Sequence, residues 1–174
     1  ELDVESLKGK TFSIRNLNFS YSGEERLILD DISFDIPAGK KVGVLGGIGA
    51  GKTTLVNCLN HHLDVPQGSI FLGERDITSF SRSDLRRYVK TVTQDPYLFS
   101  ATVEDNIRFG SSDTELAKSQ VNEVLELSQL ASDVTRFEHG DQTLVGEKGI
   151  MLSGGQKQRL SIARALLQPT DLII

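Results

Sequence analysis

The stretch Gly46-Gly-Ile-Gly-Ala-Gly-Lys-Thr53 lies between the apolar run Val42–Leu45 and a helix-like stretch, Thr54–Asn60. Glycines let successive backbone N–H groups turn toward a polyphosphate, where side chains would block its approach. A helix that begins directly after the loop directs its unpaired N–H groups at the same anion. Strand, loop and helix together predict a nucleotide-binding site. The alternative is a glycine-rich turn that binds nothing.

The residue types of this loop indicate its chemistry. Lys52 can reach the β- and γ-phosphates, and the Thr53 hydroxyl can ligate Mg²⁺. We expect the nucleotide to contact the whole loop and the residue after it: Gly46, Gly47, Ile48, Gly49, Ala50, Gly51, Lys52, Thr53 and Thr54.

The composition limits the class of protein. The chain has 174 residues, of which 38% are hydrophobic, so it can bury one core but is too short for two domains of usual size. A net charge of −5 argues against a nucleic-acid-binding surface, which needs clustered Lys and Arg. The one dense basic cluster, Arg82, Arg86 and Arg87, fits a solvated helix face.

The sequence contains no apolar run of about 18 residues, and its acidic start does not resemble a signal peptide. We therefore expect a soluble, cytosolic chain. Cys58 is the only cysteine, and a small buried side chain is the expected role. The spacing of His61, His62 and His139 suits no metal site, so surface or helix-face positions are expected for them.

Hydrophobic periodicity predicts the secondary structure. Alternation over Thr11–Tyr21 predicts a half-buried strand with a slip near Asn16. Further strands are expected at Ile28–Leu29, Ile32–Ile36, Lys41–Leu45, Ser69–Leu72 and Val89–Thr93. Helices are expected after the loop to about His62, at Asp84–Tyr88, within Thr102–Arg136 and at Ser153–Leu167. Within Thr102–Arg136, apolar residues recur at spacings of three to four, namely Val121, Val124, Leu125, Leu127 and Leu130. A phosphate loop after a strand favours an α/β fold with a mostly parallel sheet, to which an antiparallel layer is added.

A second motif, Leu152-Ser-Gly-Gly-Gln156, opens the last of these helices. Ser153 and Gln156 have the spacing of a capping box, and capping alone is one interpretation. However, two successive glycines weaken a helix start by about 1 kcal/mol each relative to alanine. They are better explained if an anion approaches the backbone closely at this helix N-terminus.

With both motifs on one chain, the sequence resembles the nucleotide-binding domain of ABC transporters over nearly all its length. Leu152–Gln156 matches the family's signature, and the loop from Gly46 matches its Walker A motif. Gln94 matches the glutamine that helps to bind Mg²⁺ and senses the membrane domain, and Tyr21 matches the aromatic residue that stacks on adenine. The plainer alternatives are a tyrosine that only packs at a strand end and a loop amide bonded to the backbone.

The resemblance implies ATP and Mg²⁺ as cofactors, with Thr53 and Gln94 at the metal and Lys52 and Gln94 as catalytic residues. It also implies that the signature of one subunit closes over ATP held by another. Contacts with ATP in trans are thus expected from Ser153, Gly154, Gly155 and Gln156. A head-to-tail pair would explain why one chain carries two anion-seeking helix starts.

The resemblance further implies a single ABC ATPase domain over residues 1–174. Its P-loop core would comprise 41–66, 88–94 and 168–174, with an antiparallel β-subdomain at about 1–40 and 67–80 and a helical signature subdomain at 95–167. Phe99–Ile107 and Gly146–Gly149 look like the exporter branch. The implied partners are a second nucleotide-binding domain, identical or different, and transmembrane domains that hold it at the cytoplasmic face of a membrane; no nucleic acid is expected.

Some positions depart from the family pattern. Ile48, Thr93 and Lys148 are mild departures. The apolar run Asp171–Ile174 matches the beginning of the Walker B strand, and the family's two catalytic carboxylates and its switch histidine would follow it. Little ATP hydrolysis is therefore expected of this chain alone. Two other functions stay open: a soluble ABC ATPase that acts on nucleic acid or ribosomes, and a module that holds ATP without hydrolysing it.

Overall fold

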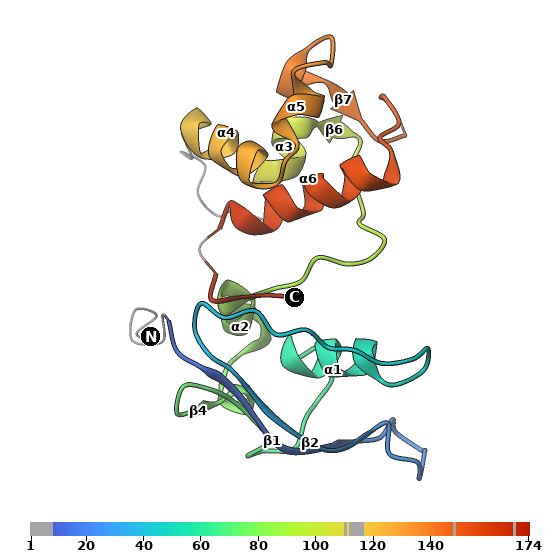
Figure 1. Cartoon of the computed structure of the whole chain (residues 1–174), viewed down its shortest axis with the longest axis vertical. Coiled ribbons are helices and arrows are strands. Elements are labelled where there is room, and N and C mark those ends of the chain that lie inside the picture. Colours follow the sequence, from blue (N-terminus) through green and yellow to red (C-terminus); the bar gives the residue numbers. More distant parts are fainter. Residues whose placement is uncertain (1–8, 110, 112–116, 148, 169) are drawn as a thin grey trace. The chain divides into compact units, whose positions relative to one another are not determined.

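The chain divides into two compact units. The computed structural model describes residues 9–109, 111, 117–147, 149–168 and 170–174 (Figure 1). Unit 1 extends to Lys90 and includes Ile174, and unit 2 runs from Thr91 to Ile173. The division passes through the expected P-loop core, whereas the expected helical subdomain at 95–167 lies wholly within unit 2. The subdomain boundaries stay a prediction.

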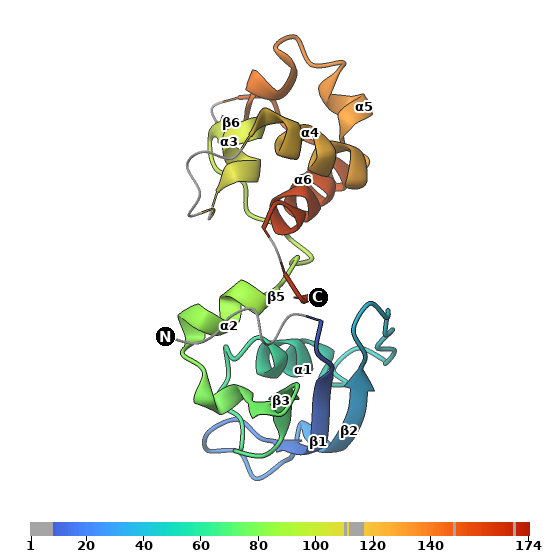
Figure 2. The same cartoon turned by 90° about the vertical axis from the view of Figure 1, so that its left-hand side faces the viewer.

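Unit 1 contains a four-stranded antiparallel sheet in the order β2-β1-β3-β4. Figures 1 and 2 show α1 over one face of this sheet. The elements of unit 1 are β1 (Phe12–Phe19), β2 (Leu29–Ile36), α1 (Lys52–Leu59), β3 (Ile70–Leu72), β4 (Arg75–Asp76), the 3-10 helix η2 (Ile77–Ser79), α2 (Arg82–Tyr88) and β5 (Val89–Lys90).

Two opposed bulges shape the β1–β2 ladder. Between the pairs Ile14↔Phe34 and Leu17↔Ile32, β1 carries one extra residue. Asn16 has a left-handed φ of 43° there, and its backbone N–H donates to the Ser33 hydroxyl at 2.8 Å. Short polar side chains tolerate this conformation best, and a bulge leaves an extra residue unpaired. The slip expected near Asn16 is therefore confirmed.

The core of unit 1 lies between the sheet and α1. Ile14, Leu17, Ile70 and Leu72 of the sheet are fully buried. Cys58 of α1 is buried as a free thiol, as predicted, and burial raises its pKa to about 11. Its role is therefore packing, because a thiol in this state offers almost no thiolate at neutral pH.

The strand expected at Lys41–Leu45 does not form, and this prediction was wrong. These residues take part in no ladder, and the Leu45 side chain is 96% exposed. A strand of a parallel sheet is stabilised only when neighbours pair with it on its edges and helices cover its faces. Among the described residues, the strands that pair within unit 1 are antiparallel, and none of them pairs with this segment.

Unit 2 is mainly helical, and Figure 1 shows α3, α4 and α5 grouped around α6. Its short ladder pairs β6 and β7 antiparallel. The elements of unit 2 are β6 (Ala101–Thr102), α3 (Val103–Arg108), α4 (Lys118–Leu127), α5 (Ala131–Val134), the 3-10 helix η3 (Gly140–Gln142), β7 (Leu144–Val145), α6 (Gly154–Leu166) and β8 (Leu172–Ile173).

The core of unit 2 forms where α6 meets α3 and α4. Leu160 and Ala163 of α6 are fully buried, and they are spaced three residues apart on one face of the helix. Val121 and Leu125 of α4 pack in the same cluster, which confirms the predicted periodicity. The exception is Leu127, the last residue of α4, which is 62% exposed.

Candidate nucleotide-binding segments

The phosphate loop leads into α1 through a left-handed glycine. Gly51 has a φ of 84°, and an added Cβ would lie 3.0 Å from the Ile28 carbonyl oxygen. Both the backbone angle and the close contact require glycine here. α1 then begins at Lys52, and no side-chain cap occupies the N–H groups at its start.

Lys52 closes the loop on itself. Its ammonium donates to the carbonyl oxygens of Gly46 and Gly47, each at 2.7 Å. The loop residues 46–50 are exposed, including the side chain of Ile48. Thr53 in the first turn is exposed as well. The segment therefore presents a cation, a hydroxyl and backbone groups on one accessible surface, which is the donor set that a polyphosphate requires.

Tyr21 is held beside this surface. Its hydroxyl lies 3.1 Å from the hydroxyl of Thr54, a buried residue in the first turn of α1. Its ring meets the Phe19 ring edge-on, with centroids 5.2 Å apart and an interplanar angle of 88°. The structure thus brings together Tyr21 and the loop from Gly46 to Thr54, all within unit 1.

The second motif begins α6 as a complete capping box. Ser153 is the N-cap, and its hydroxyl accepts from the Gln156 N–H at 3.3 Å. The Gln156 side-chain oxygen in turn accepts from the Ser153 N–H at 2.9 Å. Ser153, Gly154 and Gly155 are exposed. The cap predicted from the sequence is confirmed, and it leaves the two glycines at the surface.

Among the residues that the structure describes, none makes a contact that requires these two glycines. A Cβ added to Gly154 would meet no atom within 4 Å, and one added to Gly155 would meet only Arg159 Nη1, at an ordinary 3.5 Å. Because glycine weakens a helix relative to alanine, internal stability does not explain the pair. A group from outside that approaches this backbone closely does explain it.

Both segments lie within the match to a known protein family. A family model described as "ABC transporter" matches residues 29–174, which include both the phosphate loop and the signature motif. The chain belongs to the ABC transporter family. Membership implies an ATP-binding domain, and it confirms the α/β fold class expected from the sequence.

Individual ABC relatives agree over almost the whole chain. The ATP-dependent lipid A-core flippase of Vibrio parahaemolyticus is 39% identical over 98% of this chain, and that of Yersinia pestis is 37% identical over 100%. The mitochondrial iron-sulfur clusters transporter ATM1 of Chaetomium globosum is 41% identical over 95%. The chain spans 29%, 30% and 27% of these relatives, respectively, so it matches less than a third of each.

A solved ABC structure confirms the fold. It is described as a bacterial Atm1-family ABC exporter with ATP bound, and it matches 94% of this chain with a TM-score of 0.84 and 33% sequence identity. The matching part is 28% of that exporter's chain. The described residues of the present ABC chain contain no helix long and apolar enough to cross a membrane.

Gln94 lies in unit 2, as do the signature residues, whereas Tyr21 and the phosphate loop lie in unit 1. Gln94 is exposed and belongs to no helix or strand. Among the residues that the structure describes, no group of three or more His, Cys, Asp or Glu could hold a metal ion. The two residues predicted to bind Mg²⁺, Thr53 and Gln94, therefore belong to different units, and their role at a metal stays a prediction.

The sequence analysis did not single out three polar residues in unit 2 of this ABC domain. One is Asp133 of α5, whose carboxylate accepts from Gln156 Nε2 at 3.0 Å and from Arg159 Nη2 at 2.6 Å. Hydrogen bonds from Gln156 and Arg159 hold the pKa of Asp133 below its usual value. No sequence signal marks Asp133, because it lies 23 residues before Gln156 on a separate helix.

The second is Asn106, a fully buried side chain in α3. Its amide donates to the carbonyl oxygens of Phe99 and Thr102 at 3.0 Å each, and its oxygen accepts from the Phe99 N–H at 2.9 Å. Arg164 of α6 donates to the Asn106 side-chain and backbone oxygens at 3.0 and 2.8 Å, and to the Tyr97 carbonyl at 3.1 Å. Asn106 thus fixes the exporter-like segment to the signature helix.

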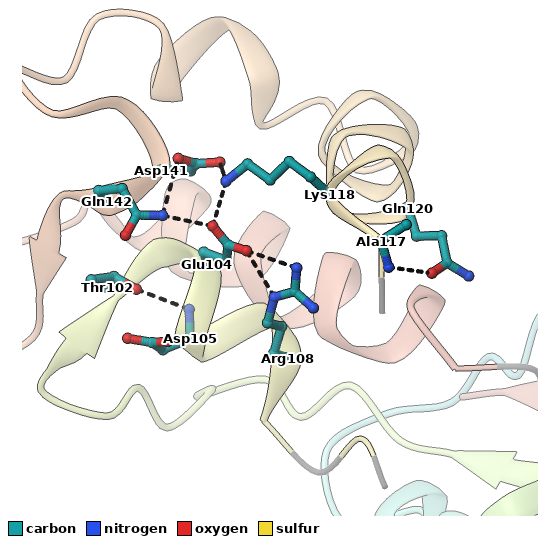
Figure 3. A network of polar contacts seen from close by, with 9 residues as sticks. All are labelled: Thr102, Glu104, Asp105, Arg108, Ala117, Lys118, Gln120, Asp141 and Gln142. Atoms are coloured by element: carbon teal, nitrogen blue, oxygen red, sulfur yellow. Dashed lines mark hydrogen bonds and ion pairs between the residues drawn. The ribbon is translucent and has the colours of Figure 1, made fainter. Parts of the chain in front are cut away.

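The third is Glu104, the centre of a charged cluster shown in Figure 3. Its carboxylate pairs with Arg108 at 2.8 Å and with Lys118, and it accepts from Gln142 at 2.6 Å. Lys118 also pairs with Asp141. Burial alone would raise the pKa of Glu104, but hydrogen bonds from Lys118 and Arg108 outweigh it and the pKa lies below its usual value. The cluster ties α3, α4 and η3 together.

Proposed function

We propose that this chain is most of the nucleotide-binding domain of an ABC exporter, which couples MgATP binding and hydrolysis to transport by membrane domains. The observation that carries the proposal is the pair of exposed glycine-rich helix starts, at Gly46–Thr53 and at Ser153–Gly155. The first has a lysine and a hydroxyl beside it, and the second has glycines that the chain itself does not need.

ATP would bind on the unit 1 surface. The loop from Gly46 to Gly51 would surround the phosphates with N–H groups, and Lys52 would leave its two carbonyl partners to reach the β- and γ-phosphates. Tyr21 would stack on the adenine ring, which needs no base-specific hydrogen bonds. Mg²⁺ would be held by Thr53 and Gln94 together with phosphate oxygens and water, and it would neutralise charge on the phosphates.

The signature would act on ATP held by a second copy or a related chain. Ser153, Gly154 and Gly155 are exposed, so Ser153 Oγ and the two glycine N–H groups are the contacts we assign to that ATP. The amide of Gln156 is bonded at both ends within its own chain. We therefore propose that Gln156 acts on the ATP indirectly, by capping the helix start that contacts it.

The membrane partners follow from the relatives. The matched flippases, the ATM1 transporter and the Atm1-family exporter are transport proteins by name, and this chain matches less than a third of each. We propose that the longer protein carries transmembrane domains and that this domain lies at their cytoplasmic face. Nothing in the comparisons supports a soluble ATPase that acts on nucleic acid.

We expect the 174-residue chain to bind ATP but to hydrolyse it poorly. The proposed site residues include no carboxylate to orient the attacking water, and phosphoryl transfer depends on such positioning. A steady-state ATPase assay tests this expectation against a version extended through the Walker B carboxylates. Equal turnover by the two proteins would contradict it.

The in-trans arrangement is tested by mixing two inactive variants of the longer protein. Lys52→Ala disables the phosphate loop, and Gly155→Glu blocks the signature with a charged side chain. Only a mixed pair contains one intact site, made from the loop of one copy and the signature of the other. We expect ATPase activity to reappear on co-expression and to be absent from each variant alone. If the protein pairs with a different chain, the two changes are placed in one chain each.

A further inference from the structure

Asp133 connects α5 to the first turn of the signature helix. One carboxylate oxygen accepts from Gln156 Nε2 at 3.0 Å, and the other accepts from Arg159 Nη2 at 2.6 Å. Gln156 and Arg159 lie three residues apart on one face of α6, and each donates to a different oxygen of the Asp133 carboxylate. Asp133 therefore holds two side chains of α6 with a single largely buried group.

The bond from Gln156 fixes the orientation of an amide that caps the helix. The Gln156 oxygen accepts from the Ser153 N–H at 2.9 Å while its nitrogen donates to Asp133. A flipped amide would place its NH₂ group against the Ser153 N–H and its oxygen against a carboxylate, which is unfavourable at both ends. Because an anion cannot donate, Asp133 selects the one orientation that caps Ser153.

The bond from Arg159 to Asp133 holds a positive charge in place beside the two glycines. Arg159 Nη1 lies 3.5 Å from the position that a Cβ on Gly155 would occupy. A cation near a helix N-terminus is opposed by the helix dipole, and a carboxylate on the far side of the guanidinium offsets this. Without Asp133, the guanidinium would lose this anchor and could move across the exposed backbone.

We propose that Asp133 is a positioning residue for the in-trans ATP contact, which it supports by orienting the Gln156 amide and by anchoring Arg159 in one position beside Gly155. The inference rests on the proposed function of the signature. Asp133 itself does not touch the nucleotide. It sets the shape of the helix start that does, so its removal affects catalysis by way of Gln156.

The local part of the proposal is tested by amide hydrogen exchange on the 174-residue chain without nucleotide. In Asp133→Ala the Ser153 amide should exchange roughly three- to tenfold faster, the change expected for one hydrogen bond. Ser132→Ala, at an exposed neighbouring position on α5, is the matched control and should leave Ser153 unchanged. If Asp133→Ala does not fold, Asp133→Leu replaces it, since leucine has the same branching at Cγ and no acceptor for Gln156. Unchanged exchange at Ser153 in a folded variant would overturn the proposal.

The functional part is tested by a double-mutant cycle on the ATPase of the longer protein. Asp133→Ala should lower kcat about tenfold with little change in KM, because the loop that binds ATP first is untouched. Adding Asp133→Ala to Gln156→Ala should cost little more, since both act on the same cap. Additive losses, or a change in KM alone, would overturn the proposal. If the wild-type protein fails to bind ATP, the proposed function fails, while the exchange result still decides the role of Asp133 in the cap.

Discussion

The hydroxyl of Tyr21 lies 3.1 Å from that of Thr54, which joins the turn after β1 to the first turn of the phosphate-loop helix. Tyr21 is 39% exposed, and its ring packs edge-on against the ring of Phe19. An aromatic ring that is anchored at its hydroxyl and left partly open is already oriented for stacking. The proposed adenine contact therefore needs little ordering of this side chain on binding.

Substitution of Tyr21 separates the stacking from the anchor. Tyr21→Ala removes the ring and should weaken MgATP binding about tenfold, since base stacking contributes roughly 1 to 3 kcal/mol. Tyr21→Phe keeps the ring and loses only the bond to Thr54, so a change of threefold or less is expected. Isothermal titration with MgATP measures both. Equal affinity for the alanine variant and the wild type would show that Tyr21 only packs.

Gly155→Ala should affect stability and activity in opposite directions. Alanine favours the helix by about 0.5 to 1 kcal/mol, and its Cβ meets only Arg159 at 3.5 Å, so thermal unfolding of the 174-residue chain should shift upward. ATPase activity of the longer protein should fall, because the methyl group obstructs the approach of a phosphate. A variant that is both more stable and fully active would contradict the assignment of the signature to ATP.

Asn106→Ala should destabilise unit 2 by about 2 to 3 kcal/mol. The change leaves the Phe99 N–H without the acceptor it has in the side chain of Asn106, takes a donor from the carbonyl of Thr102, and removes an acceptor of Arg164. Denaturant unfolding measures the loss. Asn122→Ala, at an exposed position of α4, is the control and should change stability by less than about 0.5 kcal/mol. Equal stability of the two variants would contradict the role given to Asn106.

The Glu104 cluster makes unit 2 sensitive to acid. Because the folded-state pKa of Glu104 is lowered, its stabilisation is complete above the unfolded-state pKa of about 4.3 and is lost as the pH falls through the folded value. Glu104→Gln should cost about 1 kcal/mol at pH 7, a modest figure because solvent screens the half-exposed Lys118, and should flatten the acid dependence. Glu123→Gln, an exposed control, should leave the pH profile of thermal unfolding unchanged.

Local patterns predicted much of this fold. The bulge at Asn16, the helix after the loop, the periodicity of Val121 and Leu125 and the cap at Ser153 all depend on neighbours within a few residues. Such features are set by backbone preference and by the spacing of apolar side chains. Lys52 was named from a local motif, whereas Tyr21 was named from the resemblance to the ABC family. Their roles toward ATP stay predictions.

What the sequence missed depends on long-range contacts. Asp133 acts on Gln156 from another helix, and Asn106 is held by Arg164, which lies 58 residues further along the chain. Neither partner belongs to a short motif. The strand expected at Lys41–Leu45 failed for a related reason, since an apolar run becomes a strand only where another strand pairs with it. The apolar character of Lys41–Leu45 predicted a strand, but it does not indicate whether another strand pairs with this segment.

The most direct test of the account is equilibrium binding of a fluorescent ATP analogue with Mg²⁺ to the 174-residue chain and to its Lys52→Ala variant. Lys10→Ala, an exposed lysine before β1, is the matched control. The account predicts saturable binding by the wild type and the control, and affinity at least tenfold weaker for Lys52→Ala, because the phosphates lose their charged partner. Binding that is unchanged by Lys52→Ala would contradict the central claim that the loop from Gly46 to Thr53 holds the nucleotide.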